Sequence, residues 1–259
     1  MTWGHAVIIL IAGIWAGAIN SVVGSGTLVT FPVLVALGYS PLTATTSNAI
    51  GVAPGSISGA IGYRKVLTGF WPQVARLSVA SFLGAICGAI LLLSLPKDAF
   101  ESIVPALVGL AVVLVIIQPK VSRWIAKRRA VAGVAGADPD GIPALLLFFT
   151  FLIGIYGGYF TAAQGVLLMA VMGMTLSEPL QRLNGARNVL SAIVNVVAGT
   201  IYAFVAPISW PVVAILAIGS TLGGQIGARI GLELKPAVLR GVIVVVGVAA
   251  MVHLVTVPN

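Results

Sequence analysis

The chain has 259 residues, of which 59% are hydrophobic and only 8% are charged, and its formal net charge is +8. No Asp, Glu, Lys or Arg precedes Arg64, and several later stretches of about 20 residues are also uncharged. Helices of that length cross a bilayer, so the composition excludes a soluble globular protein and indicates a multi-pass helical membrane protein. The basic residues collect in a few loops, which is typical of cytoplasmic loops and does not indicate nucleic-acid binding.

The first predicted unit is an interrupted helical hairpin at 6–37. Its middle, from Asn20 to Thr27, is rich in Gly, Ser and Thr, and glycine weakens a helix. We expect one helix to end there and another to begin. At membrane depth, irregular backbone is tolerated only where protein buries it or where it lines a cavity, so the break is a candidate substrate site. For Gly13 and Gly17, whose spacing is GxxxG, the alternative is close helix packing.

The rest of the first half, which spans 1–117, is predicted to contain three full membrane spans. They cover 43–62, 73–95 and 102–117. A hydrophilic segment rich in Lys and Arg follows at 118–141, and we expect it to be a solvated cytoplasmic linker between the halves.

The second half, 142–259, repeats this plan. An interrupted hairpin is expected at 143–175, followed by spans at 183–205, 210–228 and 241–257. The first unit aligns with the second so that Gly13 matches Gly154, Gly17 matches Gly158, Gly24 matches Gly165 and Asn48 matches Asn188. Interrupted segments at matching places in two halves are typical of transporters and point to the binding site.

Basic loops predict the orientation. With the 118–141 linker in the cytoplasm, the loop at Arg64 and the loop at 229–240 are cytoplasmic as well. The hairpin at 6–37 then begins and ends outside, the hairpin at 143–175 begins and ends inside, and both chain termini are extracytoplasmic. The expected fold is an all-α integral membrane protein of two inverted repeats, each an interrupted helical hairpin plus three transmembrane helices. Whether the hairpins cross the membrane fully or are re-entrant stays open.

Two hairpin tips that enter from opposite faces are expected to meet near the midplane. A helix that begins after a Gly/Ser break offers free backbone N–H groups and a positive dipole end, which together suit an anion. The candidate substrate-binding residues lie at the tips and at the starts of the following spans. They are Asn20, Ser21, Gly24, Ser25, Gly26, Ser47, Asn48, Thr161, Gln164, Gly165, Asn184, Arg187 and Asn188.

Two of these assignments have an equally strong structural alternative. Arg187, about one turn into its span, either attracts the anion or extends to the cytoplasmic interface. Asn48 and Asn188 either face a common cavity or join helices through hydrogen bonds.

The absence of certain residues also bears on function. No Asp or Glu lies well inside any span, so a carboxylate proton relay is not indicated. Expelling a monovalent anion from a cell with a negative interior is downhill by roughly 2.3 kcal/mol per 100 mV, which favours export. With two His, one Cys and no buried acid, we expect no catalytic centre, no metal site and no cofactor.

The chain resembles the sulfite exporter TauE/SafE family of membrane permeases over nearly its whole length. The resemblance rests on the segment from Gly17 to Leu28 with Pro32, on its second copy, on Pro41 with Thr43 to Asn48, and on the basic linker. The family usually has a run of glycines where this chain has Gly-Ser-Gly, from Gly24 to Gly26. The resemblance implies export, and in some members uptake, of sulfite and other small sulfur-containing or organic anions.

The sequence therefore predicts an anion transporter of the cell membrane that works by alternating access around the paired tips. Its expected partners are a small anionic substrate and the lipid bilayer, with no nucleic acid, and a homo-oligomer is left open. The alternatives are a channel-like anion pore or an importer of another organic anion in the same fold. A membrane-embedded enzyme or a structural subunit is a third reading.

Overall fold

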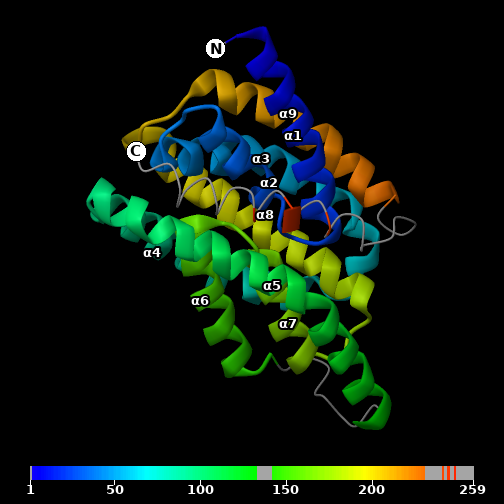
Figure 1. The fold of residues 1–259 in the computed structure, drawn as a ribbon. Coiled ribbons are helices and arrows are strands. Elements are labelled where there is room, and N and C mark those ends of the chain that lie inside the picture. Colours follow the sequence, from blue (N-terminus) through cyan, green and yellow to red (C-terminus); the bar gives the residue numbers. More distant parts are fainter. Residues whose placement is uncertain (1, 133–141, 231–240, 242–243, 246–247, 249–259) are drawn as a thin grey trace.

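The computed structural model of the protein consists of helices and their connections in the residues it describes, which are 2–132, 142–230, 241, 244, 245 and 248. The helices follow one another with short connections (Figure 1). They are α1 (Trp3–Val22), α2 (Thr27–Ala36), α3 (Pro41–Gly62), the 3-10 turn η1 (Arg64–Leu67), α4 (Trp71–Ser94), α5 (Lys97–Ala132), α6 (Ala144–Phe160), α7 (Gln164–Thr175), α8 (Leu180–Val205) and α9 (Trp210–Ile230).

Five of the described helices contain a segment long and apolar enough to cross a membrane: α1, α4, α5, α8 and α9. Helix α3 coincides with the span expected at 43–62 and has 22 residues, but it falls outside this set because it is less apolar. Its polar residues, among them Asn48 and Ser56, are buried between other helices. A helix surrounded by protein can carry such residues because they find partners inside the bundle.

Both predicted helix breaks are present, but the arms of each hairpin differ in length. Helix α1 has 20 residues and α2 has 10, while α6 has 17 and α7 has 12. At 1.5 Å per residue α1 is about 30 Å long, which matches the thickness of the hydrocarbon core, whereas α2 is about 15 Å long, half of that thickness.

The boundary expected after residue 117 is absent, because α5 continues as a helix to Ala132. Residues 118–132 are therefore helical, and the segment apolar enough to cross a membrane runs only to Val121. Lys, Arg and Ala, which dominate this stretch, are good helix formers, so the helix continues through it. The charges of Lys and Arg indicate where the helix leaves the apolar region, but they do not end the helix. The rest of the expected linker, 133–141, and most of the expected span at 241–257 lie outside the described residues.

Helix packing depends on glycines at two matching interfaces. Helix α1 lies along α9, and α6 lies along α4, with α3 and α8 packed on each other between these pairs (Figure 1). A Cβ added to Gly17 would lie 2.1 Å from the carbonyl oxygen of Ser220 in α9, and one added to Gly88 of α4 would lie 2.1 Å from that of Ile155 in α6. The backbones are thus in direct contact, as the packing interpretation of the GxxxG spacing predicts.

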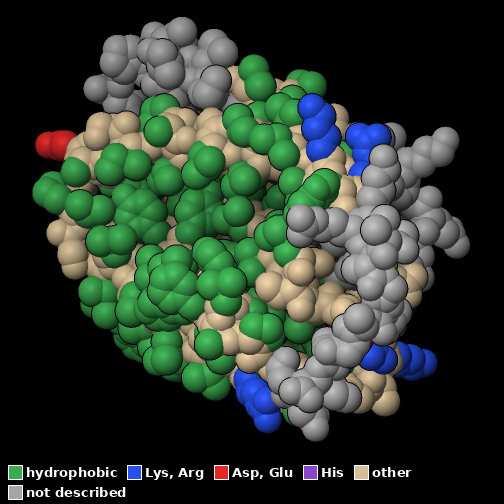
Figure 2. All heavy atoms as spheres, turned by 90° about the horizontal axis from the view of Figure 1, so that it is seen from below, with side chains coloured by type: hydrophobic (Ala, Val, Ile, Leu, Met, Phe, Trp, Pro, Cys, Tyr) green, Lys and Arg blue, Asp and Glu red, His purple; other side chains and the backbone are tan. Residues whose placement is uncertain are grey.

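The outer surface suits a lipid environment. Large apolar side chains are exposed on several helices, including Val79, Ile116 and Ile218. Figure 2 shows one face covered mainly by hydrophobic side chains, with Lys and Arg near its rim. Such a distribution is typical of a protein whose sides contact hydrocarbon and whose edges meet water.

We expect Gly17→Val to destabilise the protein by about 3 kcal/mol or more, because the new side chain overlaps the α9 backbone. Thermal unfolding in detergent, followed by size-exclusion chromatography, measures the effect. Gly4→Val in the same helix is the matched control, since the nearest atom to a Cβ there is 3.9 Å away. Equal melting temperatures for the two variants would contradict the close contact of α1 and α9.

Candidate substrate site

The first break is shaped by a glycine that ends α1. The amide of Gly24 donates to the carbonyl oxygen of Ile19 (3.1 Å), and Gly24 has a φ of +85°, a left-handed conformation that glycine adopts without steric cost. Helix α2 then begins at Thr27, with Gly26 before it and no side chain capping its first amides. A Cβ on Gly26 would lie 2.2 Å from the carbonyl oxygen of Ala16, so this residue packs directly on α1.

The second break reaches a similar shape without glycine. Thr161 and Ala163 have φ values of +47° and +58°, which are unfavourable for residues with a Cβ. The hydroxyl of Thr161 donates back to the carbonyl oxygen of Gly157 in the last turn of α6 (2.9 Å). Helix α7 begins at Gln164, again without a side-chain cap. No residue type in this stretch signals left-handed backbone, so the sequence did not predict it.

The two breaks touch each other. The amide of Gly165 donates to the carbonyl oxygen of Gly24 (3.1 Å). A Cβ on Gly24 would lie 2.7 Å from the Cα of Gly165, and the reverse distance is 2.6 Å. Any side chain at either position would separate the breaks. Two segments that are about 140 residues apart in the chain thus form one joint, and their contacting glycines are the pair that the repeat aligned.

Arg187 of α8 lies beside this joint and is only 1% exposed. Its Nη2 donates to the carbonyl oxygens of Ser21 (2.7 Å) and Asn20 (3.0 Å), and its Nη1 donates to that of Val22 (3.4 Å). These carbonyls end α1, where the helix dipole is negative, so the dipole offsets the buried positive charge. The interpretation of Arg187 as a side chain reaching the membrane interface is wrong, because the guanidinium is buried inside the protein.

Two asparagines of α8 add to the same cap. The amide nitrogens of Asn184 (3.3 Å) and Asn188 (3.2 Å) both donate to the carbonyl oxygen of Ser21, which also accepts from Arg187. The Ser21 hydroxyl donates to the carbonyl oxygen of Gly224 in α9 (3.1 Å). One carbonyl at the end of α1 therefore receives three donors from a single face of α8.

Sequence reasoning missed two residues that extend this polar face. Ser56 of α3 accepts from the side-chain amides of Asn20 (2.9 Å) and Asn195 (3.0 Å). Asn195 lies seven residues after Asn188, hence on the same side of α8 two turns later. That helical spacing of asparagines was the available signal.

The first half contributes one asparagine that holds the start of α2. The side-chain amide of Asn48 donates to the hydroxyl of Thr27 (3.2 Å), and its oxygen accepts from the hydroxyl of Thr30. Asn48 and Asn188 thus bind opposite sides of the first break. Ser47 is directed elsewhere, because its hydroxyl accepts from the amide of Ser209 before α9 (3.0 Å).

Several buried polar atoms around the joint have no hydrogen-bond partner within the described residues. They are the hydroxyl of Ser25, both amide atoms of Gln164, and Nε of Arg187. Ser25 and Gln164 adjoin the two contacting glycines, while the Gln164 side chain lies against Gly157. A buried polar group without a partner costs about 1–3 kcal/mol, so each of these groups favours binding a polar ligand or water. The joint is closed in this conformation, because Ser25, Gln164 and Arg187 are each at most 2% exposed, and two grooves lie elsewhere, beside α3.

Known proteins resemble this chain over most of its length. The family model described as "Sulfite exporter TauE/SafE" matches residues 9–254. A "Probable membrane transporter protein YfcA" from Escherichia coli (strain K12) is 27% identical over 234 residues, covering 89% of this chain and 82% of the relative. A "Probable membrane transporter protein ORF9" from Sinorhizobium sp is 23% identical over 251 residues, covering 97% and 92%. A "Probable membrane transporter protein" from Haemophilus influenzae is 23% identical and covers 92% of this chain and 89% of its own length.

We expect Arg187→Met to lower the free energy of unfolding by about 2–3 kcal/mol, because three carbonyls at the end of α1 lose a charged donor. Arg187→Lys should recover part of this loss. Thermal unfolding in detergent measures both variants, with Arg123→Met, at an exposed site of α5, as the control. If Arg187→Met melted like the control, the cap on α1 would not depend on Arg187.

Proposed function

Because the chain belongs to the sulfite exporter TauE/SafE family and is a multi-pass membrane transporter, we propose that it carries a small sulfur-containing oxyanion across the cell membrane. Sulfite and small sulfonates are the substrates that fit the family description best. As a member of a transporter family, the protein is not an enzyme. Export is the proposed direction, because the membrane potential drives a monovalent anion out of the cell.

The observation that carries this proposal is the joint between the two helix breaks, with unpartnered polar atoms around it. Ser25 and Gln164 adjoin the contacting glycines Gly24 and Gly165, and the Arg187 side chain lies beside both glycines. The amides of Leu28 and Val29 in α2, and of Gly165 and Val166 in α7, already donate to backbone carbonyls, so these helix starts contribute chiefly their positive dipole ends. A sulfur oxyanion presents several acceptor oxygens, and a guanidinium, a carboxamide, a hydroxyl and the positive end of a helix are its natural partners.

An inverted repeat accounts for the arrangement of the helices around the joint. In this proposal α1 corresponds to α6, α2 to α7, α3 to α8 and α4 to α9. The contact of Gly13 with Gly219 between α1 and α9 then corresponds to that of Gly154 with Gly84 between α6 and α4, which supports the assignment. The joint of Gly24 with Gly165 pairs two equivalent residues, as expected on a two-fold axis.

This arrangement supports alternating access as the transport mechanism. The joint is closed in the present conformation, so substrate enters when one repeat moves relative to the other and exposes it to one side. The acidic residues of the described part, Asp98, Glu101 and Glu178, all lie at helix starts or connections. The described helices therefore offer no carboxylate in mid-span to couple transport to protons, which agrees with downhill export.

A binding screen of the purified protein tests the substrate class. Thermal unfolding is followed with sulfite, sulfate, thiosulfate, small sulfonates and carboxylates, each with and without sodium. A ligand that binds only the folded state raises the melting temperature, and the increase grows with the logarithm of its concentration once that exceeds the Kd. Stabilisation by one sulfur oxyanion, followed by its flux in proteoliposomes, supports the proposal. No stabilisation by any of these anions, and no flux, would overturn it.

We expect Ser25→Ala and Gln164→Leu to weaken binding of the stabilising anion by about tenfold or more each, since each removes a donor to a charged ligand. Without ligand, their melting temperatures should equal or exceed that of the wild type, because these atoms have no protein partner to lose. Ser81→Ala is the matched control: its buried hydroxyl also lacks a partner, but it lies in α4 against α6. Equal anion affinity in all three variants would remove Ser25 and Gln164 from the site.

A further inference from the structure

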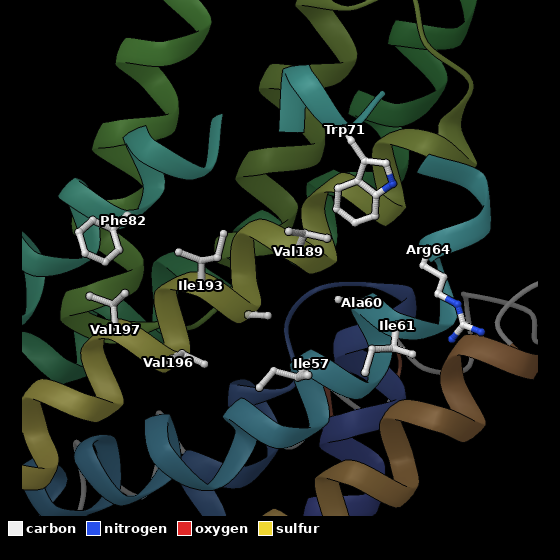
Figure 3. A pocket seen from close by; sticks show the side chains of 11 residues that line it. Ile57, Ala60, Ile61, Arg64, Trp71, Phe82, Val189, Ile193, Val196 and Val197 are labelled. Carbon is white, nitrogen blue, oxygen red and sulfur yellow. The ribbon is translucent and has the colours of Figure 1, made fainter. Parts of the chain in front are cut away.

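Two grooves flank the outer face of α3, away from the joint. The first lies between α3, α4 and α8, has a volume of about 630 Å³, and is lined almost entirely by apolar side chains. Ile57, Phe82, Ile193 and Val197 form part of its wall (Figure 3). The second lies between α3 and α9, has a volume of about 720 Å³, and is lined by both polar and apolar side chains.

The second groove carries a cluster of three basic side chains, Arg64, Lys65 and Arg229, which we call the basic cluster. All three are exposed, and within the described residues none of them makes an ion pair. The other groups lining this groove are neutral, among them Ser58, Thr221 and Gln225, so its net charge is positive.

The two grooves are neighbours and share part of their wall on α3 and η1. Ile57, Ile61 and Arg64 line both of them. In Figure 3 the Arg64 guanidinium extends from the edge of the apolar groove toward the ribbon of α9. Arg229 of α9 lines the second groove together with Arg64. Trp71, which also lines the apolar groove, is 45% exposed. Tryptophan at a protein surface of this kind marks the level of the lipid headgroups, so the basic cluster lies where hydrocarbon meets water.

We propose that these grooves bind an anionic phospholipid, with its phosphate on the basic cluster and an acyl chain in the apolar groove. An isolated inorganic anion would use the charges but leave the apolar wall without a partner. A zwitterionic lipid would fill the apolar groove but would not compensate three cations that make no ion pair within the described residues. A negative headgroup attached to a hydrocarbon chain matches both surfaces at once. The site is separate from the joint, so it does not depend on the proposed substrate.

Native mass spectrometry and thermal unfolding in detergent test this site directly. The purified protein is titrated with palmitoyl-oleoyl phosphatidylglycerol, with phosphatidylcholine of the same chains, and with inorganic phosphate alone. We expect phosphatidylglycerol to bind and stabilise the protein with about tenfold higher affinity than phosphatidylcholine. Equal affinity for the two lipids would overturn the proposal.

Variants distinguish the contribution of the basic cluster from that of the apolar groove. The double variant Arg64→Gln with Arg229→Gln should bind phosphatidylglycerol about tenfold more weakly, while its affinity for phosphatidylcholine should not change. The matched control, Lys120→Gln with Arg123→Gln in α5, lowers the net charge equally and should retain the preference for phosphatidylglycerol over phosphatidylcholine. Ala60→Phe, which fills the apolar groove, should weaken binding of both lipids. If the control variant lost as much affinity for phosphatidylglycerol, the attraction would be unspecific. If inorganic phosphate alone stabilised the protein in a way that depends on Arg64, the basic cluster would be a free-anion site. Either result contradicts the lipid site.

Discussion

The cap that α8 places on the end of α1 is the interaction on which the first half of the joint depends. A helix that ends inside a protein, away from water, leaves its last carbonyl groups without partners unless other groups donate to them. Arg187, Asn184 and Asn188 supply those donors from one face of α8. The free-energy cost of burying the Arg187 guanidinium is thereby limited, because its charge faces the negative end of a helix and needs no carboxylate partner.

Glycine makes the remaining geometry possible. Where α1 meets α9 and where α6 meets α4, backbone contacts backbone, and the same holds where Gly24 meets Gly165. Without side chains between them, the helices approach closely enough for van der Waals contacts and carbonyl interactions to hold the bundle in lipid, where the hydrophobic effect does not drive association. The second break differs, because Thr161 and Ala163 adopt left-handed backbone at a steric cost. Strain of this kind persists only where the surrounding structure holds it in place, and functional sites are where it concentrates.

Helix α8 connects the two sites proposed for this protein. Its polar side, with Arg187 and Asn188, faces the breaks, while its apolar side, with Val189 and Ile193, faces the lipid-side groove. A movement of α8 that opens the joint would therefore also change the shape of the groove. A lipid bound in the groove and an anion bound at the joint would bias the same helix, which is the physical requirement for coupling between two sites.

The sequence by itself determined the class of protein, the helical architecture, the family and the position of both breaks. These features depend on local properties, namely the length of apolar stretches and the placement of Gly, Ser and Thr, which act over a few turns of helix. It misplaced the end of α5, because polarity reports contact with water and says little about whether a helix continues. Only the tertiary structure decided the partners of Arg187, the joining of Ser56 with Asn20 and Asn195, and the turning of Ser47 toward Ser209. Those contacts join residues far apart in the chain, and they depend on how closely and at what angle whole helices pack, which no local pattern of residues specifies.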